Sequence, residues 1–171
     1  HGLVSTAFNR LDWFVSVMEW FKNWFNSDYL SVYSRRTSAQ ARDESEFALG
    51  VLGLAPSDWV LDVGCGTGRH VAYFQEYLAF AAGIDLSQQM LSAGVEENAF
   101  NCARADMRRL PFASESFSGL SCFFTGFGYL DTDHDHLRLL QEWARVLRPG
   151  GRLFLDFLHA ANVVRDLTPH S

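Results

Sequence analysis

Three glycines at alternate positions constrain this chain more than any other feature. Gly64, Gly66 and Gly68 follow an apolar stretch, residues 59–63, and precede a stretch of helical periodicity, residues 69–78. Because glycine has no Cβ, the backbone can turn sharply there and approach a ligand closely. The N–H groups at the start of the next helix then point at that ligand. The pattern predicts a strand, a ligand-binding turn and a helix, in that order.

Apolar stretches alternate with amphipathic ones along the rest of the chain. This alternation predicts parallel strands joined by helices that cover both faces of one sheet. We therefore expect a Rossmann-like, doubly wound α/β fold that binds its ligand beyond the carboxyl ends of the strands. The predicted strands are residues 59–63, 80–84, 100–105, 117–125 and 152–158, and the helices between them are residues 69–78, 88–97 and 133–147.

Two helices have a predicted core face. A helix should start at residues 43–46, where a capping residue is followed by a carboxylate, and Phe47, Val51 and Leu54 should form its buried stripe. The sequence RPGG at residues 148–151 should end the last helix. The buried face expected for that helix consists of Leu137, Leu140, Ala144 and Leu147.

Other uses of the glycine turn are less consistent with its spacing. A dinucleotide-binding turn has the form G-x-G-x-x-G, whereas the sixth position here is Arg69 and the third glycine comes one residue early. No Gly-Lys-Ser/Thr follows, which excludes a P-loop. A turn with no ligand stays possible, but three glycines carry an entropic cost that an empty turn would not require.

The motifs around the turn resemble those of class I S-adenosylmethionine-dependent methyltransferases, in the same order. Residues 60–70 (VLDVGCGTGRH) are similar to the first motif, residues 83–91 (GIDLSQQML) to the second and residues 105–112 (ADMRRLPF) to the third. The resemblance implies S-adenosylmethionine as cofactor and a strand order of 3-2-1-4-5. Enzymes of this class continue past the fifth strand with a helix and an antiparallel strand pair. We expect those strands to be missing here, so that the chain is truncated or another chain covers the fifth strand.

The resemblance also assigns roles in the cofactor site. The glycines would hold the methionine end, Asp85 the ribose hydroxyls, and Asp106 the adenine amino group, with the backbone N–H of Met107 at the ring. Asp85 follows Gly64 at roughly the 20 residues at which a carboxylate can reach a ribose. The full predicted set is Tyr33, Arg36, Asp62, Gly64, Cys65, Gly66, Gly68, Asp85, Leu86, Met90, Asp106, Met107 and Phe124.

The N-terminal segment is rich in aromatic residues and has helical spacing over residues 12–25. It is predicted to pack on the domain surface, with a lid over the ligand or an interfacial membrane helix as alternatives. We accordingly divide the chain into an N-terminal helical cap or lid, residues 1–42, and a cofactor-binding Rossmann-like domain, residues 43–171.

The composition limits the partners. A net charge of −6 argues against nucleic acid, since nonspecific affinity for phosphates needs clustered Lys and Arg. Three scattered cysteines without a CxxC pair indicate neither a disulfide framework nor a zinc site, and a cytoplasmic setting fits.

His134 and His136 would lie about 200° apart on a helix, so a shared metal is not expected, and the acidic residues beside them suit a helix start. No apolar run is long enough to span a membrane.

The predicted activity is methyl transfer to nitrogen or oxygen of a small molecule. Residues 124–129 would line the transfer cleft, and the resemblance includes small-molecule N-methyltransferases. Methyl transfer mainly requires alignment of the reacting atoms, and a base only when the acceptor arrives protonated. Tyr129 and His159 are the candidate catalytic residues. Two alternatives stay open: a catalytically impaired methyltransferase-like binding module and an NAD-type oxidoreductase. A homodimer could cover the edge of the fifth strand.

Overall fold

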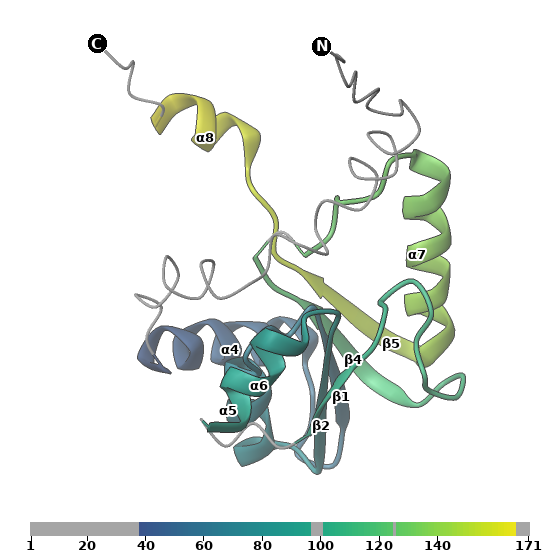
Figure 1. Cartoon of the computed structure of the whole chain (residues 1–171). Coiled ribbons are helices and arrows are strands. Elements are labelled where there is room, and N and C mark those ends of the chain that lie inside the picture. Colours follow the sequence, from purple (N-terminus) through teal and green to yellow (C-terminus); the bar gives the residue numbers. More distant parts are fainter. Residues whose placement is uncertain (1–37, 97–100, 125, 167–171) are drawn as a thin grey trace, which may run out of the picture.

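A five-stranded parallel sheet forms the centre of the molecule (Figure 1). The computed structural model describes residues 38–96, 101–124 and 126–166. The strands are β1 Trp59–Val63, β2 Phe80–Asp85, β3 Cys102–Arg104, β4 Phe117–Cys122 and β5 Leu147–Leu155. Every neighbouring pair is parallel and the order is β3-β2-β1-β4-β5. The predicted fold class and strand order are confirmed.

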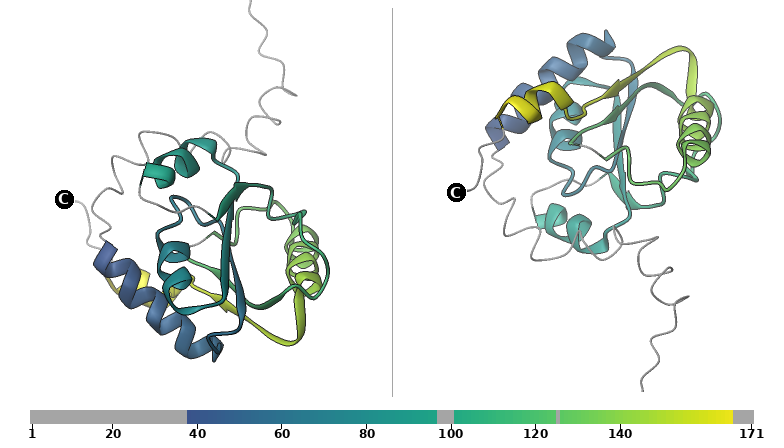
Figure 2. Two further views of the ribbon diagram at one scale, coloured as in Figure 1. Left: turned by 90° about the horizontal axis from the view of Figure 1, so that it is seen from below. Right: turned by 90° about the horizontal axis from the view of Figure 1, so that it is seen from above.

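Helices cover both faces of this sheet. They are α4 Ser38–Leu52, α5 Arg69–Tyr77, α6 Gln88–Glu96, α7 Asp133–Val146 and α8 Ala160–Asp166. Figure 2 shows α4, α5 and α6 on one side of the sheet and α7 on the other. The short helix α8 follows an extended segment after β5 and lies away from the sheet (Figure 1).

Alternate residues of the strands feed two apolar cores. In β1, Val60 packs with α4 and α5, whereas Leu61 and Val63 pack on the α7 side. Because side chains alternate across a strand, a strand buried on both faces must be apolar along its whole length. This explains the uninterrupted apolar stretch in the sequence, and it makes the one acid within it, Asp62, exceptional.

Three strands differ from the predicted bounds by more than one residue. β4 stops at Cys122 rather than residue 125, because Phe124 adopts a φ of +52°, which no extended strand allows. β3 is confined to Cys102–Arg104. β5 begins at Leu147, which pairs with Phe117, so the RPGG sequence belongs to the strand, and a register shift follows.

The predicted start of α4 is wrong, and so are two of the three residues of its predicted core face. The third, Leu54, lies after the helix and packs half-buried against the core. The chain is already helical at Ser38, so the predicted start at residues 43–46 lies inside the helix. Phe47 and Val51 are 66% and 51% exposed. The buried positions are Ala41, Ser45, Ala48 and Leu52. Three of these four residues are small, which lets α4 approach α5 closely and turns the larger side chains outward.

The predicted core face of α7 is right for two of its four residues, Leu140 and Leu147, which pack against the core. Leu137 is 54% exposed and Ala144 is exposed, while Leu140 and Leu147 are half-buried. The buried residues are Leu139, Trp143 and Val146. Trp143 is the largest buried side chain of the described residues, and its Nε1–H donates to the carbonyl oxygen of Met107 at 3.2 Å. A partner for this indole N–H lets tryptophan, rather than a leucine row, occupy the core.

Some predictions concern residues that the structure does not describe. The helix at residues 12–25, Tyr33 and Arg36 lie in this part, and the division at residue 42 stays a prediction. In the described part, β5 lies at an edge of the sheet, with Leu153 and Leu155 38% and 37% exposed. None of the helices described is both long and apolar enough to cross a bilayer.

Candidate functional site

The glycine turn bends over the end of β2. Gly64, Gly66 and Gly68 have φ angles of +74°, +59° and +76°, in the region that favours glycine. The N–H groups of Gly64 and Cys65 both donate to the carbonyl oxygen of Ile84, at 2.8 and 3.0 Å. Gly68 then forms the N-cap of α5. The turn therefore has the sharp bend and the helix N-terminus that the sequence predicts.

Asp85, the last residue of β2, faces this turn. Its Oδ2 accepts a hydrogen bond from the N–H of Gly66 at 2.8 Å, and its Oδ1 accepts one from the N–H of Ser87 at 2.7 Å. Burial raises the pKa of Asp85, and the backbone hydrogen bonds oppose that shift. Each carboxylate oxygen can accept a second hydrogen bond. The side chain thus fixes the turn and keeps acceptor capacity for hydroxyl groups.

Asp62 brings a second carboxylate into the same region. Its side chain is 1% exposed, and its Oδ1 accepts a hydrogen bond from the Ser121 hydroxyl at 2.8 Å. Its Oδ2 is buried and has no hydrogen-bond partner among the residues described. Burial raises the pKa of Asp62 to about 7, and the negative charge of Asp85 adds to the shift. An uncommitted buried oxygen of this kind fits a cationic or hydrogen-bonding group of a ligand.

Two methionines border the glycine turn. A Cβ on Gly64 would lie 3.7 Å from Cε of Met107, and one on Gly66 would lie 3.3 Å from Cε of Met90. The structure thus brings the turn, Asp85, Met90 and Met107 together, with Leu86 half-buried after Asp85. The Cys65 side chain points into the apolar core instead, so this residue can offer only its backbone to a ligand.

A helical glycine also supports the turn, and the sequence analysis missed it. A Cβ on Gly94 of α6 would lie only 2.0 Å from the carbonyl oxygen of Thr67. Only glycine therefore lets α6 pack directly against the turn. An isolated glycine inside a helical pattern is the signal that could have found it.

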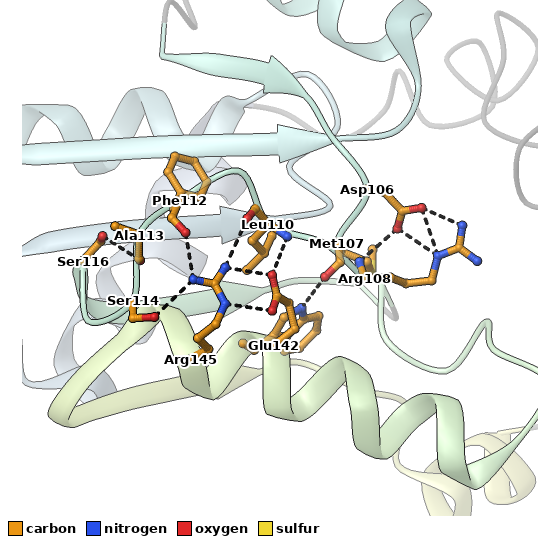
Figure 3. A network of polar contacts seen from close by, with 11 residues as sticks. Asp106, Met107, Arg108, Leu110, Phe112, Ala113, Ser114, Ser116, Glu142 and Arg145 are labelled. Atoms are coloured by element: carbon orange, nitrogen blue, oxygen red, sulfur yellow. Dashed lines mark hydrogen bonds and ion pairs between the residues drawn. The ribbon is translucent and has the colours of Figure 1, made fainter.

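Asp106 follows β3 and binds Arg108 (Figure 3). Its Oδ2 accepts from Nη2 of Arg108 at 2.6 Å, and its Oδ1 accepts from the Arg108 backbone N–H at 2.9 Å. Arg108 thus forms an ion pair with the carboxylate that, according to the resemblance, would bind an adenine amino group. Binding of adenine there would require the carboxylate to be shared with Arg108 or released from it.

Helix α7 fixes the segment that carries Asp106 and Met107 (Figure 3). Glu142 Oε1 accepts from the N–H of Leu110 at 2.7 Å, and Arg145 donates to the carbonyl oxygens of Leu110 and Phe112. Arg145 also holds Glu142, which lowers the pKa of that glutamate. The sequence analysis missed both residues, although a Glu–Arg pair at i,i+3 on a helix was a usable signal.

The end of β4 is strained and held by a residue after β5. The N–H of Phe124, which has a positive φ, donates to Oδ2 of Asp156 at 3.2 Å. The Arg69 guanidinium lies 4.9 Å from the centre of the Phe124 ring. Backbone strain of this kind is frequent at functional sites. Asp156 was missed, although it is an acid at a strand end like Asp85.

The neighbouring His70 joins α4 to this region. Its ring stacks on Phe123 at a centroid distance of 3.9 Å, and its Nε2 lies 2.9 Å from Oε2 of Glu44. Arg69 contacts the same glutamate. Glu44, which the sequence analysis considered only as part of a helix start, therefore orients the first residues of α5.

The two candidate catalytic residues lie beyond the ends of β4 and β5. Tyr129 is half-buried on the segment before α7. A Cβ on the adjacent Gly128 would lie 3.2 Å from Cε2 of Phe157, so this segment packs near the residues after β5. His159 is exposed, and its carbonyl oxygen accepts from the N–H groups of Asn162 and Val163 at the start of α8. Their catalytic roles stay predictions.

The acidic segment at residues 131–136 begins α7, as predicted. The Thr132 hydroxyl accepts from the N–H of Asp135 at 3.1 Å and caps the helix, and Asp133 and Asp135 lie in its first turn. His136 Nδ1 lies 2.9 Å from the carbonyl oxygen of Thr132. Within the described ranges, no three His, Cys, Asp or Glu side chains are grouped as metal ligands.

A doubly wound sheet with a glycine turn after β1 and an acid ending β2 defines an α/β domain that binds a nucleoside cofactor. The chain matches the family model described as "Methyltransferase domain" over residues 60–151, more than half of its length, and it belongs to this family. The predicted membership of the class I S-adenosylmethionine-dependent methyltransferases is thereby confirmed.

Known relatives agree with this family. The chain is 41% identical over 102 residues to a demethylmenaquinone methyltransferase of Mycobacterium sp. (strain KMS). The matched region is 60% of this chain and 42% of the relative. The chain therefore spans less than half the length of that curated relative. It is 25% identical to CalS10, an amino pentose methyltransferase of Micromonospora echinaspora whose structure contains S-adenosylmethionine, with a TM-score of 0.61. This match covers 75% of this chain and 55% of CalS10. The chain is 26% identical to the sugar N-methyltransferase KedS8 of Streptoalloteichus sp., with a TM-score of 0.59. This match covers 74% of this chain and 51% of KedS8.

S-adenosylmethionine is the cofactor of this family, and the residues present fit it. The positive φ angles of the turn give its backbone the close approach that a ligand needs. The uncommitted oxygen of Asp62 suits the positively charged end of the cofactor, and the spare acceptor sites of Asp85 suit its ribose hydroxyls.

Proposed function

We propose that this chain is the cofactor-binding domain of a methyltransferase that transfers a methyl group from S-adenosylmethionine to nitrogen or oxygen of a small molecule. One observation carries the proposal. The carboxylate of Asp85 reaches back to the N–H of Gly66, so the turn after β1 and the acid after β2 form one site. A turn without a ligand would not need this acid, three glycines and a second buried carboxylate in one place.

Different residues of the chain would bind different parts of the cofactor. The turn, residues 64–68, would contact the methionine part, with Asp62 accepting a hydrogen bond from its ammonium group. Asp85 would accept from the ribose, and Asp106, with the backbone of Met107, would bind the adenine. Met90 and Leu86 would supply apolar contacts beside the nucleoside. Tyr33 and Arg36 complete the predicted set from the N-terminal segment.

Catalysis in this proposal consists of alignment in a dry site. The bound cofactor supplies an already activated methyl group, so no nucleophilic residue is needed. Phe124 would form a wall of the acceptor site, held by its bond to Asp156. Orientation of two reactants in this way can contribute about 7–11 kcal/mol to lowering a barrier. Tyr129 and His159 are the residues proposed to remove a proton from a protonated acceptor.

The nature of the acceptor is supported by the relatives alone. Two solved relatives bear names that refer to amino sugars or sugar nitrogen, and a curated relative bears the name of a demethylmenaquinone enzyme. We favour an amine on a small molecule. A demethylmenaquinone, which would be methylated at a ring carbon instead of at nitrogen or oxygen, is the second candidate, because the relative that bears this name has the higher sequence identity.

Calorimetry with S-adenosylhomocysteine tests the cofactor part of the proposal. We expect binding by the wild-type chain, weakening of about tenfold or more in Asp85→Asn, and no change in Asp43→Asn, which alters an exposed acid on α4. Absence of binding by the folded wild type, or equal affinity of all three proteins, would contradict the proposed site. Titration with NAD tests the oxidoreductase alternative.

A product assay tests the transfer. Labelled S-adenosylmethionine is offered with amino sugars, simple amines, hydroxylated metabolites and a demethylmenaquinone. Label transferred to an amine supports the favoured reading, and label transferred to the quinone supports the second candidate. Cofactor binding with no transfer to any acceptor would favour the binding-module alternative.

A further inference from the structure

One row of side chains crosses the sheet beneath the glycine turn. The strand register places Cys102 of β3 beside Gly83 of β2, Gly83 beside Asp62 of β1, and Asp62 beside Ser121 of β4. Register partners in a parallel sheet project from the same face. Gly83 therefore leaves a gap in this row, with the Cys102 thiol on one side and the Asp62 carboxylate on the other.

The Cys65 side chain fills this gap. A Cβ on Gly83 would lie 2.7 Å from Sγ and 2.8 Å from Cβ of Cys65. Because Cys102 is the register partner of Gly83 on the adjacent strand, Cys65 takes the place next to Cys102 in this row. Cys65 belongs to the turn and Cys102 to β3, so residues distant in sequence present two thiols to each other. Both are free thiols in the structure.

The two thiols influence each other's protonation. The neighbouring Cys102 and burial raise the pKa of Cys65, whereas the neighbouring Cys65 lowers the pKa of Cys102. The S–H of Cys65 itself donates to the carbonyl oxygen of Gly66 at 3.9 Å. Cys65 is buried and Cys102 is half-buried. Cys102 is therefore the more accessible and more acidic thiol, the combination that makes a cysteine reactive towards oxidants. Cys122 differs from both because it lies in the other core, and burial raises its pKa as it does that of Cys65.

We infer that Cys65 and Cys102 form an oxidisable dithiol that closes to a disulfide when the protein meets a peroxide. Cys102 attacks an oxygen of hydrogen peroxide and becomes a sulfenic acid, and the other oxygen leaves as water. The Cys65 sulfur then attacks the Cys102 sulfur, forming the S–S bond and releasing a second water, whose hydrogens come from the sulfenic acid and the Cys65 thiol. Each sulfur gives up one electron overall, and the peroxide takes up both.

Closure of this disulfide would act on the cofactor turn, a consequence that rests on the proposed function. A disulfide fixes the two Cβ atoms about 3.8 Å apart, so Cys65 would be drawn towards β3. The residues on either side, Gly64 and Gly66, have the N–H groups that bond Ile84 and Asp85. Movement of Cys65 would disturb both bonds. We expect the oxidised protein to bind S-adenosylhomocysteine about five- to tenfold more weakly, a typical coupling between linked sites.

Peptide mapping tests the disulfide without any cofactor. The full chain is reduced, freed of reductant, treated with hydrogen peroxide, blocked with N-ethylmaleimide and digested for mass spectrometry. We expect a peptide that links Cys65 to Cys102, with Cys122 still blocked as a thiol. Cys122→Ser is the matched control and should form the same link, whereas Cys102→Ser should form none. A wild type that shows no such link, or a link to Cys122 instead, would overturn the inference.

Calorimetry then tests the effect on the turn. Oxidised wild type should regain its affinity for S-adenosylhomocysteine after treatment with dithiothreitol, and Cys102→Ser should have the same affinity before and after peroxide. Equal affinity of linked and reduced wild type would overturn the coupling to the turn. If reduced wild type does not bind S-adenosylhomocysteine, the proposed function is contradicted. Peptide mapping then still shows whether Cys65 and Cys102 form a disulfide, because that experiment needs no cofactor.

Discussion

Replacement of Asp62 by asparagine should stabilise the ligand-free protein at alkaline pH and weaken its binding of S-adenosylhomocysteine. The substitution is nearly isosteric, and the asparagine carbonyl can still accept from Ser121. It removes the negative charge that β1 buries beside Asp85. The other half of the asparagine amide is a donor, and it would replace the carboxylate oxygen that has no partner among the described residues.

The magnitude follows from the pKa of Asp62. A rise from the ordinary value of 3.8 to about 7 corresponds to about 4 kcal/mol between the two protonation states. Because the folded protein holds this proton more tightly than the unfolded chain, the stabilisation is complete below a pH of about 4. It is lost as the pH rises through 7. An unsatisfied amide donor costs about 1–3 kcal/mol, so Asp62→Asn should be more stable than wild type by about 1–3 kcal/mol at pH 8 and no more stable at pH 4.

Urea denaturation, followed by tryptophan fluorescence at several pH values, measures this difference. The free energy of unfolding of wild type should fall between pH 4 and 7 more steeply than that of Asp62→Asn, and Asp43→Asn should follow wild type. In calorimetry, affinity for S-adenosylhomocysteine should fall by about tenfold or more, as expected for loss of a charged hydrogen bond. Parallel pH profiles of wild type and Asp62→Asn would refute the assignment of a raised pKa to this residue.

Three further substitutions, with Gly50→Ala as a control, probe the site. Asp85→Asn removes the acceptor of one of two backbone N–H groups, those of Gly66 and Ser87, and should lower the free energy of unfolding by about 1–3 kcal/mol. Urea denaturation measures this loss, and an unchanged midpoint would contradict the role of Asp85 in holding the turn. Gly94→Ala should destabilise the protein by about 1–3 kcal/mol through its clash with the turn, whereas Gly50→Ala, at a helical glycine with open space, should stabilise it by up to about 1 kcal/mol. Equal thermal midpoints of these two variants would be inconsistent with the packing of α6. Arg108→Ala should change stability by less than about 1 kcal/mol and strengthen S-adenosylhomocysteine binding, because it releases the Asp106 carboxylate; weaker binding in calorimetry would instead give the arginine a direct role.

Helix faces were the weakest part of the sequence-based prediction. In α4 the large residues Phe47 and Val51 were expected inside, yet the small residues Ala41 and Ala48 are buried there. Periodicity locates a helix, but which of two adjacent stripes turns inward depends on the space left by the neighbouring helix. The same holds for α7, where the environment of Trp143 decided the face.

The geometry of the glycine turn was predictable from local sequence, whereas several contacts of the candidate site were not. The glycines at 64, 66 and 68 and the acid at 85 could be found because local backbone geometry and a strand end dictate them. Glu142, Arg145 and Asp156 had usable signals, a Glu–Arg pair on a helix and an acid at a strand end, that the prediction did not use. Their contacts with Leu110, Phe112 and Phe124 could not be predicted, because these partners lie far away in sequence. Nothing in the local pattern marked the hydrogen bond between Asp156 and Phe124.

By itself, the sequence determined the parallel α/β sheet, its order of elements and the sharp glycine turn, because strand burial, helix periodicity and glycine conformation are local properties of the chain. Only the tertiary structure decided which charges and thiols meet. Strand register placed Cys102, Gly83, Asp62 and Ser121 in one row and brought Cys65 over its gap. The raised pKa of Asp62 and the reactivity proposed for Cys102 depend on that row, since burial and neighbouring charges, rather than residue type, set a pKa.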